Sequence, residues 1–157
     1  MIRHLTPLFI FCLILLTWSC NEPSENKDAA SVQKIAFLDI PFSNAMDSAA
    51  ANDKLIFIDA FADWCMPCRQ MDRSVFTESS VAEYFNTHFI SLQIDIEKEE
   101  GPAFSTIYNV SLLPTLLFID NKGTVIYSAQ GFKSPSGLLE LAKKAQTLYQ
   151  NKSAGNS

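Results

Sequence analysis

Two cysteines, Cys65 and Cys68, lie two residues apart in the stretch FADWCMPCRQ, directly after the strand-like run KLIFIDA. A pair with this spacing serves as a structural disulfide, as half of a metal site or as a dithiol that exchanges electrons. A zinc site needs about four ligands, and His88 is the only histidine after the apolar N-terminal segment, so no metal is expected. A disulfide that closes so short a loop restricts the unfolded chain little, which disfavours a purely structural role. Electron exchange is the favoured chemistry.

Thiol–disulfide exchange requires a thiolate, and the residues after Cys65 indicate how one would form. Cys68, Met71 and Val75 recur three or four residues apart, which predicts a helix that begins at the pair. The N-terminus of a helix presents unpaired N–H groups and lowers the pKa of a thiol placed there. We therefore expect Cys65 to be the nucleophile and Cys68, one turn on and more buried, to resolve the mixed disulfide. Pro67 fits the first helical turn, where its missing N–H has no partner to lose.

The elements around this pair alternate between helix and strand. The pattern predicts helices over 43–54, from 65, from 80, over 101–110 and over 135–149, and strands over 55–61, 89–95, 113–120 and 124–129. Strands separated by helices favour parallel crossovers, whereas the DNKG turn predicts an antiparallel hairpin between the last two strands. The expected result is a mixed sheet with helices on both faces. Ser43 is the expected N-cap of the first helix, and residues 34–40 form either a further strand or a surface segment.

Three stretches, FIDAFADWCMPCRQM, SLLPTLLFID and GFKSPSGLLEL, carry a resemblance to a known family. The chain resembles thioredoxin-fold proteins, and most closely the thioredoxin-like domain of bacterial transmembrane thiol-disulfide interchange proteins. The resemblance extends over most of residues 35–150. It implies an α/β thioredoxin fold, with a central mixed β-sheet flanked by helices on both faces, for a domain at 34–150.

The resemblance assigns roles to three further residues. Asp59 lies in a run suited to burial, where its pKa would rise, and it matches the buried acid of thioredoxins, which implies a proton relay for Cys68. The alternative is a strand-end aspartate that faces solvent. Pro114 matches the family's cis-proline, with Leu113 presenting backbone groups to a substrate chain; the alternative is an ordinary trans proline that opens a strand.

The residues flanking the cysteines are expected to tune the site and to meet its partners. Trp64 either offers a flat apolar face to a partner or is a core aromatic residue. Met66 and Pro67, between the two cysteines, are expected to influence the redox potential. Asp63 is expected to be an exposed loop charge, and Phe132 resembles the family's loop beside the site.

The N-terminus, MIRHLTPLFIFCLILLTWSC, has a short basic start and an apolar run over 8–16 that is too short for a comfortable membrane span. It resembles a bacterial lipoprotein signal, which implies a signal peptide over 1–19, a lipidated Cys20 and a flexible tether over 20–33. The alternatives are ordinary cleavage near Ser19 or an uncleaved anchor. Each places the folded part outside the cytoplasm, on the periplasmic side of a bacterial cell envelope. Residues 151–157 are expected to form a disordered tail.

Composition narrows the function further. The net charge is −5 and no basic stretch occurs, so nucleic acid is not an expected partner. No G-x-G-x-x-G motif is present, and no cofactor is expected. We predict a lipid-anchored enzyme that reduces disulfides of exported proteins and receives electrons from a membrane thiol-electron transporter. The alternatives are a disulfide oxidase or isomerase, and a non-catalytic binding or chaperone module on the same fold.

Overall fold

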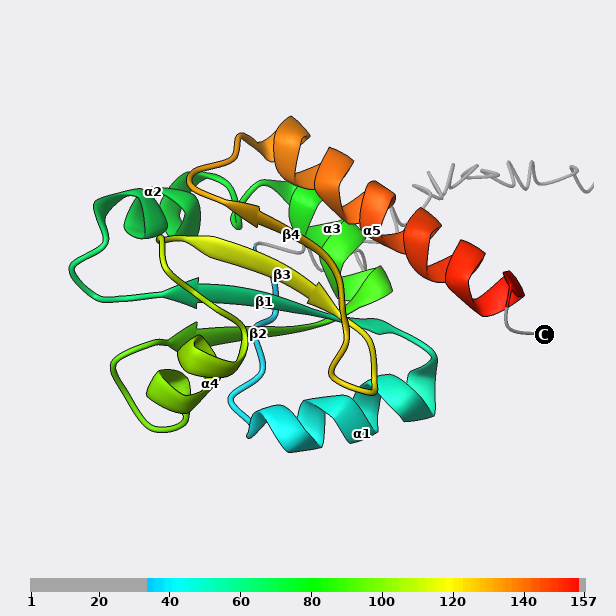
Figure 1. Cartoon of the computed structure of the whole chain (residues 1–157). Coiled ribbons are helices and arrows are strands. Elements are labelled where there is room, and N and C mark those ends of the chain that lie inside the picture. Colours follow the sequence, from blue (N-terminus) through cyan, green and yellow to red (C-terminus); the bar gives the residue numbers. More distant parts are fainter. Residues whose placement is uncertain (1–33, 156–157) are drawn as a thin grey trace, which may run out of the picture.

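The structure, a computed structural model, describes residues 34–155 of the chain (Figure 1). The predicted signal peptide, the tether and the lipidation at Cys20 lie outside the described residues. The helices within this range are α1 (Phe42–Asn52), α2 (Met66–Ser74), α3 (Ser79–His88), α4 (Gly101–Ile107) and α5 (Pro135–Gly155). Its strands are β1 (Leu55–Phe61), β2 (Phe89–Asp95), β3 (Thr115–Ile119) and β4 (Val125–Gln130). None of these helices is long and apolar enough to cross a membrane.

The strands form one mixed sheet in the order β2-β1-β3-β4. β1 pairs with β2 in parallel and with β3 in antiparallel orientation, and β3 pairs antiparallel with β4. The predicted order of elements, the parallel crossover from β1 to β2 and the final hairpin are therefore confirmed. The expected parallel crossover from β2 to β3 is wrong, because β3 runs antiparallel to β1 and hence to β2 although α4 separates them. β1 and β3 are near-continuous apolar runs because they occupy the centre of the sheet and are buried on both faces.

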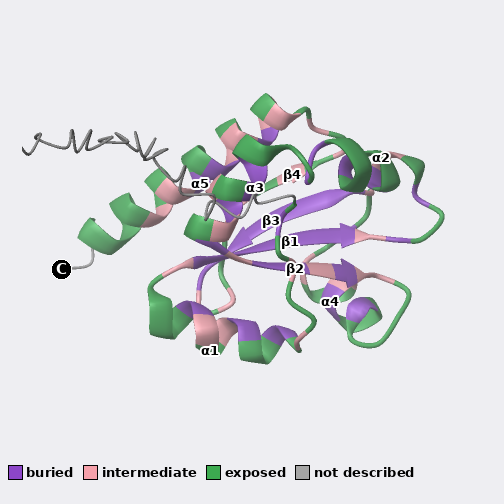
Figure 2. Ribbon diagram, turned by 180° about the vertical axis from the view of Figure 1, so that it is seen from behind, coloured by how far each residue is buried: buried purple, intermediate pink, exposed green. Residues whose placement is uncertain are grey.

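Helices cover both faces of the sheet (Figure 1). α1 and α4 pack on one face, with Phe42 and Phe104 in the same apolar cluster. Helices α2, α3 and α5 cover the other face, where Met71 of α2 belongs to a second cluster. Figure 2 shows the buried strands between the two layers and the exposed outer sides of the helices.

The alternation of side chains along β1 decides which layer each residue meets. Ile56 and Ile58 belong to the cluster on the α1 side, whereas Phe57 belongs to the cluster on the α2 side. Asp59 has the same parity as Phe57 and therefore points toward the layer that contains α2. Gln93 is the register partner of Asp59 on β2 and faces the same way. The strand register thus places the side chains of Asp59 and Gln93 on the face of the sheet that α2 covers.

Two expectations at the N-terminal side of the domain need correction. Residues 34–40 form only one isolated bridge, between Phe37 and Ser91, so they are not a regular strand. Ile35 is nevertheless fully buried, so the segment is not a mere surface run. Ser43 is not the N-cap of α1, because the helix begins one residue earlier, after Pro41.

The C-terminal helix is longer than the sequence pattern predicts. Residues 151–155 belong to α5 and are not part of a disordered tail. The apolar stripe ends near Tyr149, but polar contacts extend beyond it. Lys152 Nζ lies 3.0 Å from the buried Asp120 Oδ2, and Tyr149 donates a hydrogen bond to Asp53. These contacts hold the last turns of α5 against the body of the domain.

Candidate active site

The disulfide between Cys65 and Cys68 lies where β1 runs into α2. Cys65 is the N-cap of α2, with an extended backbone at φ −72° and ψ 103°. Its Sγ accepts a hydrogen bond from the backbone N–H of Cys68 at 3.2 Å. Pro67 lies in the first turn, as predicted. The two Cα atoms are 5.3 Å apart and the two sulfurs are bonded at 2.02 Å, so the predicted pairing is present.

Both cysteines are buried to the same extent. Cys65 and Cys68 are each 3% exposed, so the expectation that Cys68 is the more buried of the two is wrong. The reason lies in the neighbouring loop, since Leu113 packs against a small cluster formed by the cysteines and Ala62. The difference between the two sulfurs therefore lies in their place on the helix, with Cys65 at its N-cap and Cys68 in its first turn.

The loop before β3 completes the wall of the site. The peptide bond between Leu113 and Pro114 is cis, which confirms the predicted isomer. The N–H of Gly131 donates a hydrogen bond to the carbonyl of Pro114 at 2.7 Å, so the loop carrying Phe132 lies beside the cis-proline. The segment after β4 is thus joined to the loop whose Leu113 packs against the disulfide.

Asp59 is buried beneath this site. It is 1% exposed, so the alternative of a strand-end aspartate facing solvent is wrong. Burial raises the pKa of Asp59 to about 7; the hydrogen bond from Gln93 opposes this rise, and the nearby charge of Asp72 adds to it. A carboxyl group with such a pKa exchanges protons near neutrality, as a proton relay must.

Asp59 and Cys68 border one cavity of about 210 Å³. The cavity opens between β1, β2 and α2, and its remaining lining residues are Phe61, Ala62, Asp63, Arg69, Asp72 and Gln93. Most of these side chains are polar or charged, so the space is suited to water. The Asp59 carboxyl group and Cys68 therefore line the same polar cavity.

The side chains around the disulfide expose an apolar surface. Trp64 is 65% exposed and Met66 is 64% exposed, so the alternative of a core tryptophan is wrong. Leu112, which precedes Leu113, and Phe132, which follows the Gly131 that bonds to Pro114, are also exposed. Exposed large apolar side chains gathered at one site indicate a surface for a protein partner.

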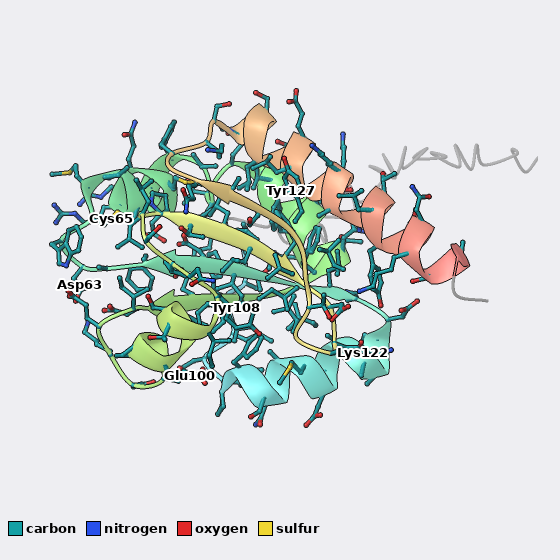
Figure 3. All side chains as sticks on the ribbon, viewed as in Figure 1. Asp63, Cys65, Glu100, Tyr108, Lys122 and Tyr127 are labelled. Atoms are coloured by element: carbon teal, nitrogen blue, oxygen red, sulfur yellow. A yellow bond between two sulfur atoms is a disulfide. The ribbon has the colours of Figure 1, made fainter. Side chains whose placement is uncertain are left out.

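Acidic and basic side chains from the loop after β2 hold the turn before α2. Trp64 Nε1 donates a hydrogen bond to Glu97 Oε1 at 3.0 Å. Asp63 is exposed, as predicted, and pairs with Lys98. Figure 3 shows Asp63 and Cys65 together at this end of the molecule. The loop between β2 and α4 therefore braces the residues that precede the nucleophile.

Sequence reasoning missed two residues at this site, Gln93 and Glu97. The alternation in FISLQID marks Gln93 as a polar position of a strand, but only the pairing of β2 with β1 sets it opposite Asp59. Glu97 carries no signal in the sequence, since it lies in an acidic loop whose path the tertiary structure decides.

The strand order, the two helical layers and the position of the disulfide are those of a thioredoxin fold. The chain belongs to the thioredoxin-like family, because residues 42–146 match the family described as Thioredoxin-like domain.

Similarity to a known thiol:disulfide interchange protein supports the same class. The chain is 28% identical over 139 residues to the thiol:disulfide interchange protein DsbD of Yersinia enterocolitica. The aligned region covers 87% of this chain and 24% of that protein. The chain thus spans about a quarter of the length of that relative. This relative, together with the Cys65–Cys68 pair, supports assignment of the chain to the thiol-disulfide oxidoreductases.

Solved structures show the same architecture. A proposed disulphide-isomerase from Bacteroides thetaiotaomicron superimposes with a TM-score of 0.64 and 41% identity, covering 71% of this chain and 93% of that one. The oxidised C-terminal domain of Neisseria meningitidis DsbD superimposes with a TM-score of 0.57 and 20% identity, covering 71% of this chain and 98% of that domain. The second likeness concerns the fold alone.

Proposed function

We propose that this protein reduces disulfides of exported proteins outside the cytoplasm through reversible opening of the Cys65–Cys68 disulfide. The observation that carries the proposal is the hydrogen bond from Cys68 N–H to Cys65 Sγ at the N-cap of α2. In the reduced protein the same donor and the positive end of the helix stabilise a thiolate at Cys65. Cys65 is the attacking sulfur and Cys68 is the resolving one.

The reaction proceeds in two exchanges. The Cys65 thiolate attacks a client disulfide, forms a mixed disulfide and releases the first client thiolate. Cys68 then gives its proton to the Asp59 carboxylate, and its thiolate attacks Cys65 Sγ. The Cys65–Cys68 bond forms, the mixed disulfide breaks, and the second client thiolate leaves and takes a proton from water. Two electrons pass from the cysteine pair to the client.

The surface around the pair supports client binding. Trp64 and Met66 offer exposed apolar area beside Cys65, and Leu113 precedes the cis-proline with its backbone available for an extended client chain. Met66 and Pro67 occupy the loop that the disulfide closes, so we assign them a role in setting the redox potential.

A second candidate is disulfide isomerisation or oxidation. The specific observation in its favour is the 41% identity to the Bacteroides thetaiotaomicron protein, itself a proposed disulphide-isomerase. Redox potential separates the two candidates. A value near about −270 mV, that of thioredoxin, supports reduction, whereas values near about −180 or −120 mV support isomerisation or oxidation.

The location and the electron source belong to the same proposal. We place the protein on the periplasmic side of a bacterial cell envelope, attached through a lipid on Cys20. A membrane-embedded thiol transporter returns electrons to Cys65–Cys68, in keeping with the likeness to proteins named thiol:disulfide interchange protein. Labelling of cells with radioactive palmitate tests the anchor: Cys20→Ser should lose the label and leave the membrane fraction.

The activity is tested with insulin and a chemical thiol donor. The wild-type protein should accelerate insulin reduction, Cys65→Ser should abolish the acceleration, and Cys68→Ser should accumulate mixed disulfides visible on non-reducing gels. Equilibration with glutathione buffers then gives the potential. A wild-type protein that leaves insulin intact, or a Cys65→Ser variant with full function in cells, would point instead to a binding module.

A further inference from the structure

We infer that Gln93 is a positioning residue that fixes the orientation of Asp59 and directs its exchangeable proton into the cavity shared with Cys68. This inference rests on the proposed function, since it concerns the proton that Cys68 releases when it resolves the mixed disulfide. Gln93 touches neither sulfur, and its effect passes through Asp59.

The sheet register places the two side chains together. Asp59 on β1 and Gln93 on β2 are direct register partners, and side chains of aligned residues point to the same face of a sheet. Gln93 Nε2 donates a hydrogen bond to Asp59 Oδ2 at 3.1 Å. Because a carboxylate oxygen only accepts, the amide nitrogen is the end of Gln93 that faces it.

The second oxygen of the carboxyl group is unpartnered. Asp59 Oδ1 is buried and makes no hydrogen bond with any described residue. Asp59, Gln93 and Cys68 all line the same cavity of about 210 Å³. With Oδ2 occupied by the amide donor, a proton on the carboxyl group resides on Oδ1. The amide thereby decides which oxygen exchanges protons.

At position 93, a neutral hydrogen-bond donor orients the Asp59 carboxyl group better than a charged or an apolar side chain of similar size would. A lysine at position 93 would pair with the carboxylate and hold it ionised, whereas an apolar residue would leave both oxygens without a partner. The amide hydrogen bond is retained whether Asp59 is charged or neutral, so the carboxyl group changes protonation without a rearrangement of β2.

Other charged side chains line the same cavity and contribute to the electrostatic environment of Asp59. Asp72 and Arg69 project from α2, and Asp63 lies in the turn before it. The nearby charge of Asp72 raises the pKa of Asp59, whereas the hydrogen bond from Gln93 lowers it. Removing the amide donor should therefore raise the pKa of Asp59 further while the other charges stay in place.

The test compares Gln93→Met, which keeps the length and removes the donor, with Ser91→Ala as the matched control. Ser91 is a buried polar residue of the same strand whose hydroxyl has no partner among the described residues. Carboxyl carbon NMR of the oxidised protein should show the pKa of Asp59 higher by about one in Gln93→Met and unchanged in Ser91→Ala. An Asp59 titration that stays in place in Gln93→Met overturns the inference.

A double-mutant cycle tests whether Gln93 acts through Asp59. The pH profile of insulin reduction should move upward in Gln93→Met, and the same change in an Asp59→Asn background should leave the profile unmoved. An equal movement in both backgrounds would reject the inference. Gln93→Leu, which also removes the donor and cannot itself donate or titrate, should likewise raise the pKa of Asp59 and serves if Gln93→Met does not fold.

The two proposals fail in different ways. The titration uses the oxidised protein without any client, so it does not depend on turnover. An inactive wild-type protein contradicts the proposed function, whereas an unmoved Asp59 titration contradicts the role of Gln93.

Discussion

The carboxyl group of Glu100 lies over the start of α1, where its Oε1 accepts a hydrogen bond from the backbone N–H of Phe42 at 2.9 Å. Glu100 is the residue before α4, and Phe42 is the first residue of α1. One side chain thus links the two helices that cover this face of the sheet. Ser43 lies inside α1 and does not cap it. Glu100 instead accepts the hydrogen bond from the first N–H of the helix.

Glu100→Ala should destabilise the domain by about 1 kcal/mol, the usual effect of losing a helix cap. The helix dipole of α1 would also lose a negative charge at its positive end. Urea unfolding of the oxidised protein measures the change. Glu83→Ala, on the exposed side of α3, is the control and should change stability by less than about 0.5 kcal/mol. Equal stability of both variants would show that the cap contributes nothing.

The buried Asp59 should make the oxidised protein less stable as pH rises. Its pKa is raised from 3.8 to about 7 by burial, so folding favours the protonated form. The stabilisation is fully present below about pH 4 and is lost as pH rises through about 7, by at most roughly 4 kcal/mol. Thermal unfolding from pH 5 to 9 measures it.

Asp59→Asn should flatten this pH dependence and stabilise the protein at pH 8, because an amide does not ionise. Asp47→Asn, at an exposed position of α1 on the other face of the sheet, is the matched control. A wild-type protein whose stability is constant between pH 5 and 9 would show that Asp59 does not titrate in that range.

The two thiols of the reduced protein should differ in reactivity. Cys65 occupies the N-cap, where the Cys68 N–H faces its sulfur, whereas Cys68 lies within the helix. Brief treatment with iodoacetamide at pH 7 should alkylate Cys65 before Cys68, as peptide mass spectrometry would show. Equal labelling, or labelling of Cys68 first, would exchange the assigned roles of nucleophile and resolver.

Trp64→Ala should weaken client exchange without loss of stability. The side chain is largely exposed, so its removal leaves no cavity, but it takes away apolar area beside Cys65. We expect kcat/KM for insulin to fall by about tenfold, an effect of about 1.4 kcal/mol that is common for an aromatic contact. Glu97→Gln, which alters only the group that holds the indole, should have a smaller effect. An unchanged kcat/KM in Trp64→Ala would show that the surface at Trp64 does not contribute to client binding.

Much of the architecture is readable from the chain. The apolar run LIFIDAF coincides with β1, because a strand at the centre of a covered sheet needs little polar surface, and the alternating stretch FISLQID coincides with β2 at the sheet edge. The spacing of Cys68 and Met71 marks the inner side of α2, since a helix repeats every 3.6 residues. The cysteine pair and its place after a strand follow from the same local patterns.

Contacts between distant segments follow no such local rule. Ser43 has the chemistry of a cap, yet Glu100, 58 positions along the chain and next to the neighbouring helix α4, supplies the acceptor at α1. The sequence pattern ends α5 too early, because the pairing of Lys152 with Asp120 cannot be read from the spacing of apolar residues. The equal burial of the two cysteines depends on Leu113, which a separate loop brings into contact with them.

The sequence by itself therefore determined the order of the elements, the identity of the reactive pair and the candidate acid Asp59, because periodicity and residue chemistry are local properties. Only the tertiary structure decided that Gln93 faces that acid, that Glu97 holds Trp64, and that one cavity joins Asp59 to Cys68. The physical reason is register: which residues meet across two strands or two loops depends on how the whole sheet and its helices pack together.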